Sequence, residues 1–346
     1  SKYINEIPIK TYGFKKTEDY ISCALMIERF YEKTKDIRYI NCLLKLCDLF
    51  QSEKKFLVYS SYIKELVSKE LNHVSELIYN AGYLKQNQLK LPEYKSKTYD
   101  NQKVIKGLTL ICCDSSRSSI YLQSLLNANI YPDHIIYMNK DKDKNKDKVN
   151  NYQYQKLTST PDWLFVPKEY IHPLQLAKRH KLKFIKIETS SVNSTIICKN
   201  LETINPKLII YCGFGGEIVS QELVSTYRFM HCHAGTLPRF RGSTTFYYEI
   251  LSKNRPSVSC ILLDKNIDAG PILSIKSFPV PFKTDNIDLL YEPSIRANLL
   301  CEVIFNSGIN LQLKTKVQPN KENKLNYYII HPVLKHVSFG LLRDTE

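Results

Sequence analysis

The apolar positions of the first part of the chain recur at helical spacing. Between residues 17 and 82 the clearest repeat has separations of four, four, three and four residues and consists of Ile63, Val67, Leu71, Val74 and Ile78. Asn80-Ala81-Gly82 then offers residues that favour the left-handed end of a helix. We therefore expect residues 1–85 to form a helical N-terminal region, either a cap packed on the main domain or a docking and oligomerisation module.

The pattern changes after a polar segment, residues 86–106, which is typical of a linker. From there, short apolar runs of strand length alternate with helical stretches. The predicted strands are Leu108–Cys113, His134–Met138, Phe184–Ile187, Leu208–Cys212, Tyr227–Met230 and Val258–Leu263. This alternation predicts an α/β fold with a mostly parallel sheet over residues 107–285. Residues 286–346 form a C-terminal extension, with a helix expected around Ile295 to Phe305.

The net charge bears on which binding partners the protein attracts, and the cysteines bear on the redox state of its compartment. The formal net charge is +15, which attracts polyanions, although a Lys-, Asn- and Ile-rich composition from an AT-rich genome would give the same excess. The polar run from 139 to 156 reads as a solvated low-complexity loop. Ten scattered cysteines without a CxxC pair favour buried thiols in a reducing compartment. No apolar stretch has membrane-spanning length, so we expect a cytoplasmic protein.

An apolar strand ends in His231-Cys232-His233, a spacing that can bring two imidazoles to one site. His231 and His233 are two residues apart, so in a strand their imidazoles lie on one face. The carboxyl ends of parallel strands are where α/β folds bind ligands. Downstream, Asp268 follows another apolar run and precedes Gly270-Pro271, which places this carboxylate on a turn. We expect the turn to bring Asp268 to the histidines.

The motifs around these residues resemble a known family. The pattern His-x-x-x-Leu-Pro-x-x-Arg-Gly from His233 to Gly242, followed by Asp-x-Gly-x-Ile from Asp268 to Ile272, is similar to that of the folate-dependent formyltransferases. These include the methionyl-tRNA, glycinamide-ribotide and sugar-amine formyltransferases. The resemblance covers residues 107–285 and implies a Rossmann-like domain. It also implies transfer of a formyl group from 10-formyltetrahydrofolate, as co-substrate, to an amine, without a metal ion.

The resemblance assigns roles by position. His233 matches the catalytic histidine, and Asp268 matches the aspartate that orients it. His231 stands where the family has an asparagine that donates a hydrogen bond to the oxyanion, a role that a histidine can also fill. The residues assigned to the folate-binding site are Gly213, Phe214, Gly215 and Ile267.

The substrate side of the site is less specific. Ser116 and Arg117 begin a predicted helix after the first strand, where backbone N–H groups favour an anion such as phosphate. Simple capping of that helix by Ser118 or Ser119 explains the same residues. With Arg241 as a further substrate-binding residue, these features suggest a phosphorylated or nucleotide-linked amine. The segment from Gly242 to Tyr248 resembles relatives of sugar pathways, so a nucleotide-linked amino sugar is the acceptor that we expect.

Three other interpretations stay open. A methionyl-tRNA formyltransferase-like enzyme fits the positive charge, although residues 286–346 are expected to be too few and too helical for the extra domain of that branch. A metal-dependent hydrolase would use His231, His233 and Asp268 as ligands, since His-x-His is also a zinc spacing. A non-catalytic binding relative would keep the fold and use its helices and basic surface. Nucleic acid is the weaker choice of partner, and an oligomer could form through the N-terminal helices.

Overall fold

The computed structural model describes residues 36–52, 99–140, 152–253, 255–319 and 326–344, and isolated positions between 23 and 34. Most of the predicted helical region, most of the linker and the centre of the low-complexity loop lie outside these described residues. The chain divides into two compact units. The first combines residues 1–89, 242–254 and 323–342, and the second combines residues 90–241, 255–322 and 343–346. The domain boundaries inferred from the sequence stay predictions.

The second unit is built on one large sheet. Within the described residues it has seven strands, in the order β5 (Phe184–Glu188), β2 (Ile130–Asn139), β1 (Lys103–Cys113), β6 (Leu208–Cys212), β7 (Phe229–His233), β8 (Ser257–Leu262) and β9 (Ile272–Ser277). The strands from β5 to β7 in this order run parallel, and β8 pairs antiparallel with both β7 and β9. The predicted α/β, Rossmann-like fold with a mostly parallel sheet is therefore confirmed.

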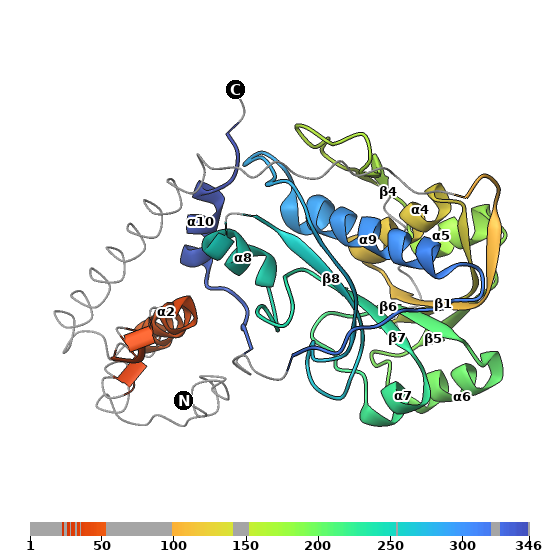
Figure 1. Cartoon of the computed structure of the whole chain (residues 1–346), viewed down its shortest axis with the longest axis horizontal. Helices are drawn as coiled ribbons and strands as arrows, with labels where there is room; N and C mark the ends of the chain where they lie inside the picture. The colour runs from red at the N-terminus through yellow and green to blue at the C-terminus, as the bar shows by residue number, and fades with distance from the viewer. Residues whose placement is uncertain are drawn as a thin grey trace. The chain divides into compact units, whose positions relative to one another are not determined.

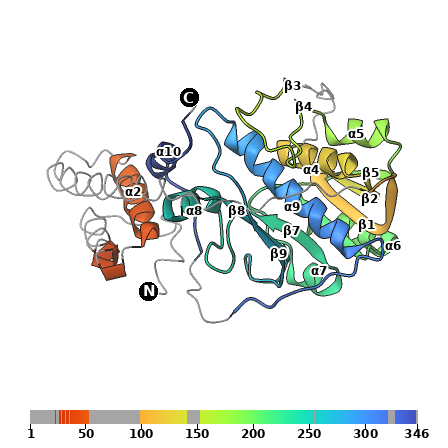
Figure 2. The same cartoon turned by 45° about the horizontal axis from the view of Figure 1, so that its top comes forward.

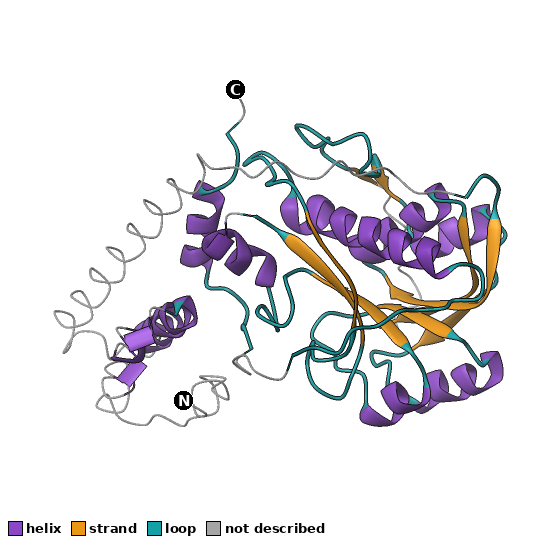
Figure 3. Cartoon of the chain, in the orientation of Figure 1, coloured by secondary structure: helices purple, strands orange, loops and turns teal. Residues whose placement is uncertain are grey.

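Helices cover both faces of this sheet (Figure 1 and Figure 3). α6 (Thr195–Ile204) and α7 (Gln221–Thr226) lie on one face, and α4 (Ser116–Asn127), α5 (Pro173–Arg179) and α9 (Glu292–Ser307) lie on the other. α9 packs along α4 and contacts β7, β8 and β9, as the turned view of Figure 2 shows. The helix predicted around 295 to 305 is confirmed, and it belongs to the layers of the α/β unit. The unit also contains the short strands β3 (Tyr152–Gln153) and β4 (Glu169–Tyr170) and the π-helix η2 (Ile287–Tyr291).

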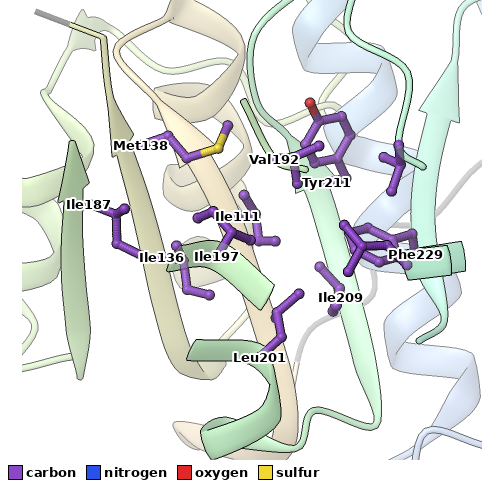
Figure 4. Close-up of a cluster of buried hydrophobic side chains, with 12 residues drawn as sticks. Ile111, Ile136, Met138, Ile187, Val192, Ile197, Leu201, Ile209, Tyr211 and Phe229 are labelled. Atoms are coloured by element: carbon purple, nitrogen blue, oxygen red, sulfur yellow. The ribbon is translucent and has the colours of Figure 1, made fainter. Parts of the chain in front are cut away.

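One apolar core lies between the sheet and the helices α6 and α7. Figure 4 draws it, with labels on Ile111, Ile136, Met138, Ile187, Val192, Ile197, Leu201, Ile209, Tyr211 and Phe229. Every residue of β6 is buried, because helices cover both faces of the sheet there. Central parallel strands of this kind have continuous rather than alternating apolar runs, and for this reason they were readable in the sequence.

The strand that carries the histidines begins and ends later than the sequence predicts. The prediction placed it at 227 to 230, whereas Tyr227 is the C-cap of α7 and the strand runs from Phe229 to His233. Antiparallel pairing with β8 extends as far as His233, which lies opposite Ser259. Both histidines are therefore inside the ladder, and neither lies in the loop that follows.

The first unit joins segments that are distant in sequence. Its described helices are α2 (Ile37–Ser52), α8 (Thr245–Lys253) and α10 (Pro332–Gly340). Asn41 of α2 accepts a hydrogen bond from the backbone N–H of His331 at 2.6 Å, and the ring of Tyr327 lies between Arg38 and Tyr248. The helical character predicted for the N-terminal region is thus confirmed for α2. None of the described helices combines the length and the apolar character needed to cross a membrane.

Candidate functional site

His233 and Asp268 form a buried pair at the carboxyl end of β7. His233 Nδ1 lies 3.3 Å from Asp268 Oδ2, and the two side chains are 4% and 11% exposed. The histidine comes from the strand and the aspartate from the turn between β8 and β9, 35 residues later in the chain. A carboxylate at this distance fixes which imidazole nitrogen carries a hydrogen and stabilises the charged ring.

The backbone around His233 is fixed by its neighbour in the sheet. Ser259, which is opposite His233 in β8, donates through its hydroxyl to the Gly235 carbonyl at 2.7 Å and accepts from the Leu237 N–H at 3.0 Å. The loop after β7 therefore leaves the strand in a defined direction. Gly235 is required there, because a Cβ at this position would lie 3.2 Å from His233 Nε2.

The other ring nitrogen of His233 also meets an acceptor. Nε2 lies 2.6 Å from the Phe240 carbonyl, which can only accept a hydrogen bond. Nδ1 faces the Asp268 carboxylate, so both nitrogens can donate at once only if each carries a hydrogen. The His233 ring therefore has an acceptor group within contact of each of its two nitrogens. No motif indicated the Phe240 contact, since it is made by a backbone atom.

His231 occupies a different electrostatic environment on the same strand. Its Nδ1 lies 3.4 Å from the Tyr211 carbonyl of the neighbouring strand β6. Burial, together with the guanidinium groups of Arg296 and Arg117, lowers the pKa of His231 to about 3, while Asp268 acts in the opposite direction. His231 is therefore neutral at physiological pH, because a third positive charge beside two arginines is unfavourable.

Arg296 is a residue of the site that the motifs did not indicate. It extends from α9, donates through Nη1 to the Cys232 carbonyl at 2.9 Å, and pairs with Glu292. The Cys232 carbonyl lies between the two histidines in sequence, so this bond holds the backbone that carries both. The available signal was an arginine four residues after a glutamate in a helix with many apolar residues.

The residues assigned to folate binding follow β6 and β8. Gly213 is packed against the protein itself, since a Cβ there would lie 2.5 Å from Met138 Cε. A Cβ on Gly215 would meet nothing within 4 Å, so the backbone at Gly215 is open on that side. Phe214 is half-buried with Lys140 Nζ 5.1 Å from its ring centroid, and Ile267 is 43% exposed on the turn that carries Asp268. No described contact tests their role in folate binding.

Polar groups of the loop after β1 make hydrogen bonds within the protein. The N-cap of α4 is Ser115, whose hydroxyl accepts from the Ser118 N–H, so neither Ser118 nor Ser119 is the cap. Arg117 Nη2 donates to the Gly213 carbonyl at 2.9 Å, which ties this loop to the one after β6. Ser116 is half-buried in the first turn of the helix. Simple capping therefore accounts for much of the loop, and an anion site at Ser116 and Arg117 stays a prediction.

Arg241 belongs to the surroundings of Asp268. Its Nη2 donates to Gln318 Oε1 at 2.5 Å, and burial lowers its pKa, an effect that the nearby Asp268 partly offsets. Gln318 in turn donates to the carbonyls of Asp268 and Gly270. The structure thus places Arg241 with Asp268, and Arg117 with Gly213. The sequence offered no signal for Gln318, which lies in a polar stretch 50 residues after Asp268.

A metal centre does not emerge from these side chains. Among the residues that the structure describes, no group of three or more His, Cys, Asp and Glu side chains is arranged to hold a metal ion, so His231, His233 and Asp268 are not such a group. The metal-dependent hydrolase interpretation therefore has no support from their geometry.

Sequence comparison matches part of the chain to known enzymes. Over 136 residues it is 26% identical to a methionyl-tRNA formyltransferase of Campylobacter jejuni, which covers 39% of this chain and 42% of that protein. It is 28% identical to the methionyl-tRNA formyltransferase of Ehrlichia canis over 148 residues, covering 41% and 46%. The resemblance to the formyltransferases is confirmed. The chain spans less than half the length of these relatives, and no family model matches it.

Structural comparison matches the chain to solved formyltransferases at low sequence identity. A sugar N-formyltransferase from Shewanella sp. FDAARGOS_354 has a TM-score of 0.43 and 19% identity, covering 69% of this chain and 89% of that one. A phosphoribosylglycinamide formyltransferase from Anaplasma phagocytophilum has a TM-score of 0.43 and 14% identity, covering 66% and 100%.

Proposed function

We propose that this protein transfers a formyl group from 10-formyltetrahydrofolate to an amine. The buried His233–Asp268 pair at the carboxyl end of β7 carries this proposal, because it combines an imidazole and an orienting carboxylate where α/β folds bind ligands. The sequence similarity to methionyl-tRNA formyltransferases supports the reaction class.

His233 would stabilise the charge that develops on the formyl oxygen during attack by the amine. The Asp268 carboxylate orients its ring as a hydrogen-bond donor, and stabilisation of such an oxyanion is usually the largest catalytic contribution. Its Nε2 hydrogen is engaged by the Phe240 carbonyl, so the formyl oxygen would share or replace that contact. Hydrogen bonds of this kind often take their final geometry only when the substrate is bound.

His231 would bind the attacking amine through a hydrogen bond. The Tyr211 carbonyl accepts from Nδ1, so the neutral ring carries its hydrogen there and presents a lone pair on Nε2. In this tautomer Nε2 accepts a hydrogen bond, for example from the N–H of the attacking amine. This differs from the oxyanion-donor role that the resemblance implies for this position.

The change His231→Phe separates these two roles. A role in holding the amine predicts a higher KM for the amine, whereas a role in stabilising the oxyanion predicts a lower kcat with an unchanged KM. Steady-state kinetics with the amine varied at saturating formyl donor distinguishes the two.

The loop after β6 offers a place for the folate. The open side of Gly215 leaves room for a flat ring, and Phe214 supplies an aromatic face next to it. Ile267 would add apolar contact from the turn that carries Asp268. The folate donor supplies the formyl group, and these residues would bind and orient it beside His233.

For the acceptor we propose a small phosphorylated amine, with a nucleotide-linked amino sugar as the first candidate. The positive net charge and the arginines of the site support an anionic substrate. The second candidate is methionyl-tRNA, because the relatives matched in sequence carry that name. Binding to tRNA would weaken steeply as salt concentration rises, since it depends on phosphate contacts.

The first experiment is calorimetric titration with 5-formyltetrahydrofolate, a stable analogue of the donor. We expect binding that weakens on changing Phe214 to Ala and that is unaffected by the change of Phe305, a residue of α9, to Leu. Formyl transfer is then assayed by mass spectrometry with a nucleotide-linked amino sugar and with methionyl-tRNA. Absence of folate binding to the intact wild-type chain would refute the proposed donor.

A further inference from the structure

Gln318 uses every polar atom of its side chain around the turn that carries Asp268. Its Nε2 donates to the Asp268 carbonyl at 2.8 Å and to the Gly270 carbonyl at 2.7 Å. Its Oε1 accepts from Arg241 Nη2 at 2.5 Å. The residue is only 5% exposed, so water does not readily replace these bonds. One neutral side chain therefore joins the turn to the end of the loop that follows β7.

The backbone of this turn needs such support. Asp268 has a φ of 49°, in the left-handed region that a residue with a Cβ seldom adopts. That conformation aims its carboxylate at His233 Nδ1, 3.3 Å away. Gln318 donates to the backbone carbonyls of both Asp268 and Gly270, at the two sides of the Ala269 residue between them, and so holds this conformation.

The segment that carries Gln318 is itself anchored to the sheet. Ile272, the first residue of β9, exchanges two backbone hydrogen bonds with Lys316, each of 2.8 Å. Gln318 lies two residues after this bridge, so its side chain reaches the turn from a fixed backbone. A displacement of the segment would therefore move the turn, and with it the Asp268 carboxylate.

We propose that Gln318 is a positioning residue for the formyl transfer proposed above. Its carboxamide holds the 268–270 turn in the conformation that directs Asp268 to His233, while its carbonyl oxygen holds Arg241 beside the same turn. Gln318 does not touch the reacting atoms and acts through Asp268. The expected effect of Gln318 on kcat rests on the proposed function. Its effect on the position of Asp268 rests only on the contacts described above.

Two substitutions separate the donor end of the carboxamide from its acceptor end. Gln318→Glu keeps the size and the acceptor for Arg241, but loses both donors to the turn. Gln318→Met keeps the approximate size and removes all three bonds. Gln312→Glu and Gln312→Met, at an exposed position of the same segment, are the matched controls.

We expect both Gln318 variants to lower kcat by on the order of 10- to 100-fold with little change in KM for the amine, since a misplaced catalytic group costs rate more than binding. The controls should keep wild-type kcat. Equal kcat in Gln318→Glu and wild type would overturn the role of the two donor bonds. Should Gln318→Met fail to fold, Gln318→Glu alone decides the question.

A second measurement does not depend on activity. Nuclear magnetic resonance of the His233 ring should show an Nδ1–H signal protected by Asp268 in the wild type and in both controls. In the Gln318 variants that signal should weaken or disappear, whereas an unchanged signal overturns the proposal. If the wild type transfers no formyl group, the proposed function fails, and this spectroscopic comparison still tests whether Gln318 positions Asp268.

Discussion

The end of β7 and the turn between β8 and β9 each supply one member of the His233–Asp268 pair, but they are held in different ways. β7 pairs with β6 on one edge and with β8 on the other, so the sheet itself fixes the direction of His233. The turn belongs to no ladder at Asp268, and a side chain from 50 residues away holds it. A catalytic pair can thus combine one member fixed by local backbone pairing with one fixed by a distant tertiary contact.

The same strand also shows how neighbours separate two chemically identical groups. His233 contacts the Asp268 carboxylate through one ring nitrogen and the Phe240 carbonyl through the other. His231, two residues earlier, lies near Arg296 and Arg117, which together with burial keep it neutral. Two imidazoles that lie two residues apart on one strand therefore have different partners, a carboxylate for His233 and a backbone carbonyl for His231.

Substitution of His233 tests the member of the pair that the sheet holds, and we expect it to have the largest effect. We expect His233→Ala to lower kcat for formyl transfer by about 100- to 10,000-fold, the usual range for the loss of an acid–base group. The exposed His336→Ala variant is the control and should retain wild-type turnover. Full turnover in His233→Ala would show that the pair is not the catalytic centre.

Substitution of Asp268 tests the member of the pair that lies on the turn between β8 and β9. Asp268→Asn keeps the size of the side chain but removes the carboxylate that orients the His233 ring, so we expect kcat to fall by roughly 100-fold. Asp264→Asn changes an exposed carboxylate near the start of the same turn and should have no effect on kcat. Equal rates for the two variants would mean that the carboxylate is structural.

The close approach of the turn to β8 gives a prediction about stability. A Cβ on Gly270 would lie 1.8 Å from the Leu262 carbonyl oxygen, so Gly270→Ala must displace the backbone. We expect a loss of about 1–3 kcal/mol in the free energy of unfolding, as for other overpacked sites. Gly215→Ala adds the same methyl group where nothing lies within 4 Å, and urea unfolding of this control should match the wild type.

The neutral state of His231 makes stability depend on pH. Its pKa falls from 6.5 to about 3 on folding, so the unfolded chain binds a proton that the folded chain does not. Its contribution is fully present above about pH 6.5 and is lost as pH decreases toward 3. We expect the unfolding free energy of His231→Asn, measured in urea from pH 7 to pH 4, to decline less than that of the wild type. Parallel curves for the two proteins would contradict the assignment.

The sequence allowed β6 to be predicted at its observed bounds, because its residues form a continuous apolar run. The predicted strands Leu108–Cys113 and His134–Met138 lie within β1 and β2, but the observed strands begin at Lys103 and Ile130, where charged residues interrupt the apolar pattern. The sequence also indicated His233 and Asp268 through their motifs. It misplaced β7 by two residues at its start, since pairing with β8 decides where that strand begins and ends. The cap of α4 was predicted too late, because several serines in a row could each have filled that position.

What the sequence determined by itself is local: which segments are strands and helices, and which side chains carry the chemistry. Apolar periodicity and turn residues act over a few positions, so they are visible along the chain. The tertiary structure alone decided that Gln318 holds Asp268, that burial together with Arg296 and Arg117 lowers the pKa of His231, and that the Phe240 carbonyl contacts His233. The residues in these contacts are not spaced in the sequence at any helical or strand period. Each contact also depends on burial, which exists only after the sheet and its helices have packed together.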